Sequence, residues 1–171
     1  MDKEMFELKR LSVAAIPAAL AKAEHYRLLN EPEEAQSICE DVLRVDPSNR
    51  AAHVTLILAL TDTFPRGEAG VVTRARELVA ALGAEYERAY YSGVVAERRA
   101  RVLLDRGGPD RFVNAGDWLR EAMRAFERAD AVKPVDQDDA LLRWNACARL
   151  FHQYPELIEA DKDRTGPLVL E

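Results

Sequence analysis

Apolar residues recur every three or four positions along most of the chain, and short stretches with proline, glycine, asparagine or aspartate separate these periodic segments. Recurrence at this interval places apolar side chains on one face of an α-helix, whereas a half-buried strand would show strict alternation. The pattern therefore predicts an all-α fold of about seven helices. The expected helices cover approximately residues 16–30, 32–46, 49–63, 67–83, 84–104, 116–131 and 138–155.

The stretches between the helices carry signals for how the helices begin and end. We expect Asn30 to adopt the left-handed conformation in the first turn, and Pro32 suits the first turn of the helix that follows. An aspartate or serine of the segment 46–48 is expected to cap the third helix. Residues 105–114 contain two adjacent glycines and a proline, which predicts an inserted loop at that point.

The length of 171 residues corresponds to about one domain, and 48% apolar residues suffice for a continuous core if the helices stack. The charged first residues have no partner helix, and the last residues combine charge with a short apolar end. We therefore expect a lead-in segment over 1–15, one helical domain over 16–160 and a disordered or loosely docked tail over 161–171.

A spacing of small and apolar residues recurs in two places. The first copy runs Tyr26, Ala35, Cys39, Val42, Pro47. The second copy runs Ala122, Phe126, Ala129, Pro134 and keeps the offsets of four, three and five residues. A degenerate copy with the same offsets lies between them, over 71–83. Repetition of one spacing within a short chain indicates a repeat architecture.

These motifs resemble the tetratricopeptide-repeat (TPR) family, over residues 16–153 as about three and a half units of the ~34-residue period. The chain is similar to small bacterial cytoplasmic members of that family. The resemblance implies a right-handed superhelical stack of antiparallel helix pairs. It also implies that a peptide or a partner helix binds in a concave groove lined by the first helix of each pair.

Transfer of that concave face onto the chain gives the residues expected to line the groove. They are Leu20, Glu24, Leu28, Asp62, Tyr90, Val94, Arg98, Asn145 and Arg149. Tyr90, Val94 and Arg98 recur every four residues and therefore share one face of the fifth helix. Asn145 and Arg149 do the same on the seventh helix, so we expect the two rows to border one concave surface.

Charge, apolar run length and cysteine content limit the kinds of partner and the cellular compartment that we expect. The formal net charge is −6, and an acidic chain without an extended basic face is a poor candidate for nucleic acid. No apolar run approaches the length of a membrane span. Cys39 and Cys147 lie at apolar positions of two helices and form no CxxC pair. We expect both to be buried thiols, which suits a cytoplasmic protein.

The usual signatures of catalysis and metal binding are missing from the sequence. His25, His53 and His152 fall on three different helices without a neighbouring ligand at helical spacing. Gly107-Gly108 lacks the lysine and hydroxyl residue of a phosphate loop, and no serine lies in a GxSxG turn. We therefore expect no catalytic residues, no metal and no cofactor.

Arginines form a local cluster at positions 98, 99, 101 and 106 and a helical stripe at 120, 124 and 128. We favour a solvated face in which they pair with Glu97, Glu121 and Glu127. The alternative is an anchor for an acidic segment of a partner protein.

The favoured function is a non-enzymatic scaffold that binds a protein or peptide partner in its concave groove. A secretion-type or assembly chaperone for an amphipathic cargo segment is the first alternative, and an enzyme in a helical shell is the second. Self-association into a homo-oligomer stays open in each case.

Overall fold

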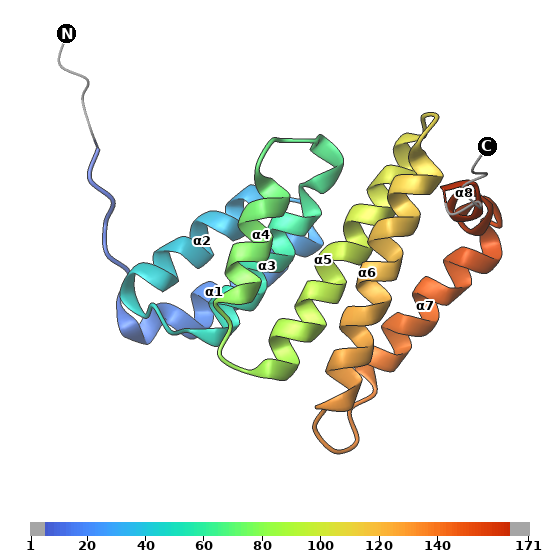
Figure 1. The fold of residues 1–171 in the computed structure, drawn as a ribbon. Coiled ribbons are helices and arrows are strands. Elements are labelled where there is room, and N and C mark those ends of the chain that lie inside the picture. The colour runs from blue at the N-terminus through green and yellow to red at the C-terminus, as the bar shows by residue number, and fades with distance from the viewer. Residues whose placement is uncertain (1–5, 165–171) are drawn as a thin grey trace, which may run out of the picture. The chain divides into compact units, whose positions relative to one another are not determined.

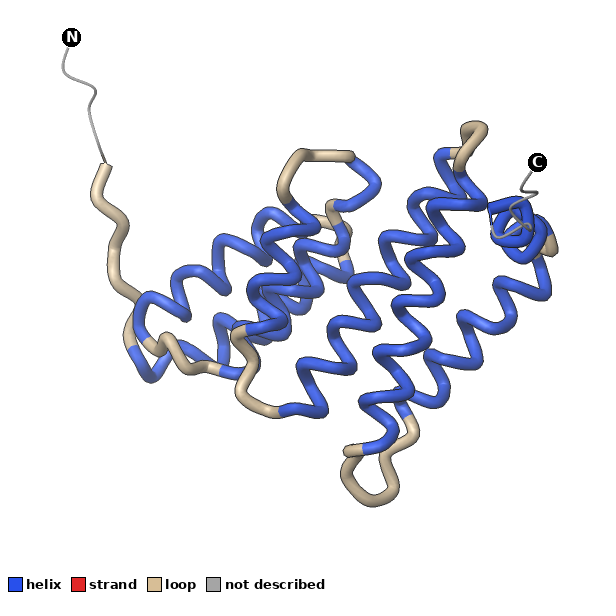
Figure 2. Tube along the Cα trace, in the orientation of Figure 1, coloured by secondary structure: helices blue, strands red, loops and turns tan. Residues whose placement is uncertain are grey.

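The computed structural model describes residues 6–164, and all regular secondary structure in that range is helical (Figure 2). The prediction of an all-α fold is confirmed. Eight α-helices and two 3₁₀ helices follow each other along these residues: η1 (Val13–Ala15), α1 (Ile16–Leu28), α2 (Pro32–Val45), α3 (Arg50–Asp62), η2 (Phe64–Arg66), α4 (Val71–Ala80), α5 (Glu85–Arg106), α6 (Arg111–Ala131), α7 (Asp139–Gln153) and α8 (Glu156–Arg164) (Figure 1).

The chain divides into two compact units, Met1–Thr63 and Phe64–Glu171, which we call unit 1 and unit 2. Unit 1 contains η1 and α1 to α3, and unit 2 contains η2 and α4 to α8. The single domain that the sequence predicts over 16–160 therefore spans both units. The first five residues of the predicted lead-in, and residues 165–171 of the predicted tail, lie outside the described residues.

Small residues bring the three helices of unit 1 together. Ala23 of α1, Ala35 of α2 and Ala52 of α3 are all completely buried. Alanine has no side chain beyond Cβ, so helix backbones can approach closely wherever it lies at a crossing. Ile16, Val42 and Ala52 form a core cluster against which Leu11 of the lead-in also packs.

The ends of the unit 1 helices follow from individual residues. Asn30 has a φ of 60°, which confirms the left-handed turn after α1, and Pro32 opens α2. The residue that caps α3 is Asn49, whose side chain accepts a hydrogen bond from the Ala52 N–H at 3.0 Å. The predicted aspartate or serine cap is therefore wrong. Asp46 instead accepts hydrogen bonds from Asn49 and Ser48, which lower the pKa of its carboxyl.

The long helices α5 and α6 form the centre of unit 2. They lie side by side, and the chain reverses direction between them through the short segment 107–110 (Figure 1). The ten-residue insertion predicted over 105–114 is thus wrong, because most of those residues are helical. Phe112 explains the extension, since its ring lies 6.2 Å from the ring of Tyr154. Gly107 and Gly108 supply the turn, with φ values of 73° and 101°.

The helix α8 follows α7 in a region for which the sequence predicted no helix, after the last expected helix and extending into the expected tail. Its Leu157 is completely buried, and Arg120 of α6 donates a hydrogen bond to the Leu157 carbonyl at 3.3 Å. Arg120 also pairs with Asp161 at 3.3 Å. These contacts dock a helix of nine residues on α6. One buried leucine gives too weak an apolar periodicity for sequence reasoning to find such a helix.

Gly93 sets the distance between α5 and α6, and its replacement should loosen the pair. A Cβ at this position would lie 2.5 Å from the ring of Phe126, which is 1% exposed and has no room to move. We expect Gly93→Ala to lower the free energy of unfolding, because overpacking costs roughly 1–3 kcal/mol and exceeds the helix-propensity gain of about 1 kcal/mol. Urea unfolding measures the change.

The control is Gly83→Ala, because a Cβ at Gly83 meets no atom within 4 Å. We expect this variant to unfold at the same or a higher urea concentration than the parent chain. Equal stability of the Gly93 variant and the parent would show that α5 and α6 leave room for a methyl group beside Phe126.

Candidate functional site

A buried carboxylate joins α5 to α7 in unit 2. Glu97 of α5 is 1% exposed. One of its oxygens accepts from Nε and Nη2 of Arg101, at 3.0 and 2.9 Å. Its other oxygen accepts from Nη1 of Arg143 on α7, at 3.1 Å. Both carboxylate oxygens therefore receive charge-assisted hydrogen bonds, which is the condition for keeping a charge in a protein interior.

The two arginines keep part of their side chains in contact with solvent. The side chain of Arg101 is 45% exposed and that of Arg143 is 35% exposed. Each guanidinium carries five N–H donors in a rigid plane, and Glu97 occupies only some of them. Tyr90 lies beside Arg143 and, together with Glu97, favours its charged form. The site therefore presents two oriented cations whose remaining donors are available to a ligand.

Aromatic rings continue this face along the first half of α5. The ring of Tyr90 stacks on Tyr86 at 5.8 Å, meets Tyr91 edge-on at 5.1 Å and lies 5.9 Å from Phe126. Burial, together with the charge of Asp139, raises the pKa of Tyr86 to about 12. The Tyr86 hydroxyl is thus neutral at ordinary pH.

The structure distributes the predicted groove residues of unit 2 over different environments. Tyr90 is half-buried on the same face of α5 as Glu97, whereas Val94 is 1% exposed and belongs to the packed interior. Arg98 is half-buried on an adjacent face of α5. Asn145 and Arg149 lie on the side of α7 opposite Cys147, which is completely buried. Arg143 of α7 reaches Glu97 of α5, whereas Asn145 and Arg149 lie on the other side of α7 and are not brought to Tyr90.

The predicted groove residues of unit 1 also lie in different environments. Leu20 packs on the edge of the core cluster, and Glu24 is exposed. Leu28 is 85% exposed. The carboxylate of Asp62 on α3 accepts two hydrogen bonds from Arg27 of α1, at 2.8 and 3.3 Å. Arg27 and Asp62 therefore tie α1 to α3, and this bond is a structural role for Asp62.

The sequence indicated a solvated arginine face paired with Glu97, Glu121 and Glu127, and this prediction is wrong in part. Glu97 does pair with Arg101, but its carboxylate is buried and not solvated. Glu121 pairs with Arg76 of α4, and Glu127 accepts a hydrogen bond from the Trp144 indole N–H at 3.0 Å. Spacing along one helix identified the i, i+4 pair but carried no information about partners on α4 and α7.

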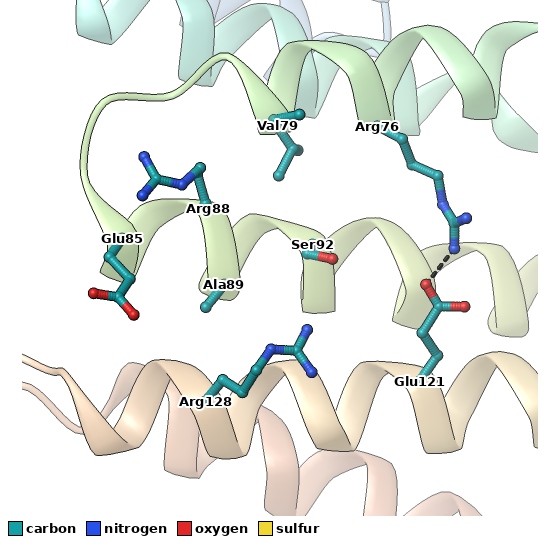
Figure 3. Close-up of a pocket in the computed structure, with 9 residues that line it drawn as sticks. Arg76, Val79, Glu85, Arg88, Ala89, Ser92, Glu121 and Arg128 are labelled. Atoms are coloured by element: carbon teal, nitrogen blue, oxygen red, sulfur yellow. Dashed lines mark hydrogen bonds and ion pairs between the residues drawn. The ribbon is translucent and has the colours of Figure 1, made fainter.

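A polar cleft of about 410 Å³ lies between α4, α5 and α6 (Figure 3). Its side chains include Arg76 from α4, Arg88 and Ser92 from α5, and Glu121 and Arg128 from α6. We call it the arginine cleft. Ser92 and Glu97 are five residues apart and point to different sides of α5, so the cleft and the Glu97 site occupy different faces of unit 2.

Most charged groups of the arginine cleft are already engaged. Arg76 forms an ion pair with Glu121 and lies over the ring of Trp118, 4.5 Å from its centroid. The Nη1 of Arg88 donates to the carbonyls of Leu82 and Gly83, at 2.7 and 2.8 Å. These two bonds fix the connection between α4 and α5.

Comparisons of the chain with family models, with curated proteins and with solved structures found no match. In residues 6–164 no group of three histidine, cysteine, aspartate or glutamate side chains is arranged to hold a metal ion. None of the helices described in that range combines the length and apolar character needed to cross a membrane.

Removing both arginines around Glu97 should strongly destabilise unit 2. Arg101→Met with Arg143→Met leaves a carboxylate that is 1% exposed without a cation. We expect the free energy of unfolding to fall by about 3–5 kcal/mol, because an uncompensated buried charge carries that cost. Addition of Glu97→Met should recover most of the loss, since it removes the buried charge.

Urea unfolding of the double variant, the triple variant and the parent chain measures these differences. Arg124→Met is the matched control, because Arg124 is exposed on α6 and no contact of its side chain involves Glu97. We expect it to stay within about 0.5 kcal/mol of the parent. A double variant as stable as this control would mean that Glu97 does not depend on its two arginines.

The two buried thiols should make the folded protein less stable at alkaline pH. Burial raises the pKa of Cys39 and of Cys147 to about 12, against 9.0 for a free thiol. Above pH 9 the unfolded chain therefore releases thiol protons that the folded chain retains, and unfolding becomes more favourable as the pH rises. We expect a decline of about 1.4 kcal/mol per pH unit for each thiol.

The measurement is urea unfolding between pH 8 and pH 10, below the range in which Tyr86 titrates in the folded chain. The control is the Cys39→Ala, Cys147→Ala variant, whose stability should depend much less on pH over this interval. Parallel pH profiles for the two chains would show that the thiols are not shielded in the folded protein.

Proposed function

We propose that this chain is a non-enzymatic binding module that holds a segment of another protein against the face formed by α5 and α7. The observation that carries the proposal is the Glu97 site. Arg101 and Arg143 are held in place from within by one buried carboxylate, and both keep exposed donors. A ligand carboxylate or backbone carbonyl can use those donors without the entropic cost of ordering the two side chains.

Aromatic side chains beside the arginines support recognition of a peptide. Tyr90 lies next to Arg143 and is packed by neighbouring rings, so it offers apolar contact area with little freedom to lose. Tyrosine and arginine are the residue types that most often dominate binding energy in protein interfaces. A protein segment that combines an apolar side chain with a hydrogen-bond acceptor fits this face.

We infer a TPR-like arrangement of antiparallel helix pairs for the chain, and its motif positions support this. Ala35 and Cys39 of the first copy, and Ala122 and Ala129 of the second, are all completely buried. Small residues at those positions are what repeat stacking requires. The proposal includes a cytoplasmic location in a bacterial cell, which the free buried thiols Cys39 and Cys147 support.

A chaperone for an amphipathic cargo segment is the second candidate, and one feature favours it. A hollow of about 280 Å³ lies between α6 and α7 and is lined mostly by apolar groups, including Phe126, Leu141 and Trp144. Leu141 is 42% exposed and Leu142 is 62% exposed. An apolar side chain of a cargo helix would find a partner surface there.

The two candidates place the partner on different sides of α7, so photo-crosslinking in the native cell separates them. A photoreactive amino acid at Asp139, in the first turn of α7 and close to Tyr86, reports on the α5 side. One at Leu141 reports on the apolar hollow. One at Ser37, exposed on α2, is the control in unit 1. We expect one partner protein to be captured preferentially from position 139.

Purified partner should then bind Arg101→Gln about tenfold more weakly than the parent chain, because one charge-assisted hydrogen bond is lost. Arg124→Gln should bind normally. Preferential capture from position 141 would favour the chaperone, and equal capture from all three positions would contradict a defined binding face.

A further inference from the structure

The arginine cleft holds a cation that the fold does not use. Within the part of the chain that the structure describes, Arg128 of α6 makes no hydrogen bond or ion pair, although it lines the cleft. Figure 3 shows its side chain reaching from α6 toward α5, in the direction of Ser92. The Ser92 hydroxyl has no hydrogen bond within the described residues either. A guanidinium and a hydroxyl therefore face the same space with their donors unused.

The remaining charges determine what the cleft can accept. Arg76 and Glu121 neutralise each other. Arg88 is bonded only to carbonyls, which leave its positive charge in place. Glu85 lines the cleft without an ion pair among the described residues. Arg88 and Arg128 against Glu85 leave a net charge of +1, in a chain whose formal net charge is −6.

We propose that the arginine cleft binds one carboxylate of an acidic segment of a protein, with Arg128 and Ser92 as the donors and Arg88 as a second positive charge. A planar guanidinium fork matches the two oxygens of a carboxylate. A single negative charge balances the cleft, whereas a phosphate dianion would leave it with an excess negative charge. Arg76, stacked on Trp118, forms a fixed wall beside the bound group.

The cleft is independent of the proposed partner face, because it lies on another side of α5. Its use would give unit 2 two separate contact surfaces, so one partner could be held on each, or a long segment could reach both. Of the arginine stripe on α6, for which the sequence offered an acidic partner segment as an alternative, Arg128 makes this contact and Arg124 does not.

The test uses the full chain labelled with ¹⁵N and a short capped peptide in which glycine alternates with glutamate. A peptide with glutamine in place of glutamate and one with phosphoserine in place of glutamate are the comparison ligands. Amide chemical shifts are followed during titration at low ionic strength. We expect saturable shifts in α4, α5 and α6 with the glutamate peptide, and binding about tenfold weaker for the glutamine peptide.

Arg128→Gln should weaken binding of the glutamate peptide by about tenfold. Arg124→Gln removes the same charge one helical turn away, outside the cleft lining, and should leave the affinity within about twofold of the parent. Both positions are exposed, so neither change should disturb the fold.

Three results would overturn the proposal. The first is equal weakening of binding by the two variants, which would indicate general charge attraction. The second is equal binding of the glutamate and glutamine peptides. The third is tighter binding of the phosphoserine peptide than of the glutamate peptide. This titration needs no native partner, so its failure leaves the crosslinking result at Asp139 unaffected, and failure of the crosslinking leaves the titration unaffected.

Discussion

A carboxylate inside a helical protein is stable only when cationic donors accompany it, and Arg101 and Arg143 provide those donors for Glu97. The ion pair with Arg143 links α5 to α7 across the face where the two helices make few other contacts. The ion pair with Glu97 holds Arg143 at its place beside Tyr90. The candidate binding face is therefore a direct consequence of one buried charge.

The helices that carry this site are placed by small residues. Gly93 of α5 lies against the ring of Phe126, and Ala122, Ala125 and Ala129 of α6 are completely buried. Such residues let α5 and α6 approach closely over most of their length, which explains why they form the most extensive helix pair of unit 2. A rigid pair of this kind gives Glu97 and the arginine cleft fixed positions on two sides of α5.

Much of the fold could be predicted from the sequence, because apolar periodicity and turn residues act locally. The helical class, the left-handed Asn30 and the start of α2 at Pro32 are examples. The extension of α6 through Phe112 could not be predicted, since it depends on the distant ring of Tyr154. The docking of α8 likewise depends on Arg120 of another helix.

The candidate site was harder to predict than the fold, for a physical reason. Helical spacing shows that Tyr90 and Glu97 share a face of α5, but it cannot show that Arg143 lies opposite them. The same limit explains the expectation for Asn145 and Arg149. Their spacing shows that they share a face of α7, but it cannot show that this face lies away from Tyr90. Charged residues in a periodic pattern look solvated until the neighbouring helix is known.

Rotation of the Arg101 and Arg143 guanidinium groups, measured by NMR, tests whether Glu97 holds both side chains in fixed orientations. We predict slow rotation and resolved Nη proton signals for both residues, and a single averaged signal for Arg124, which has no partner within the described residues. Replacement of Glu97 by glutamine should restore fast rotation. Guanidinium groups of Arg101 and Arg143 that rotate as freely as that of Arg124 would show that Glu97 does not hold them in place.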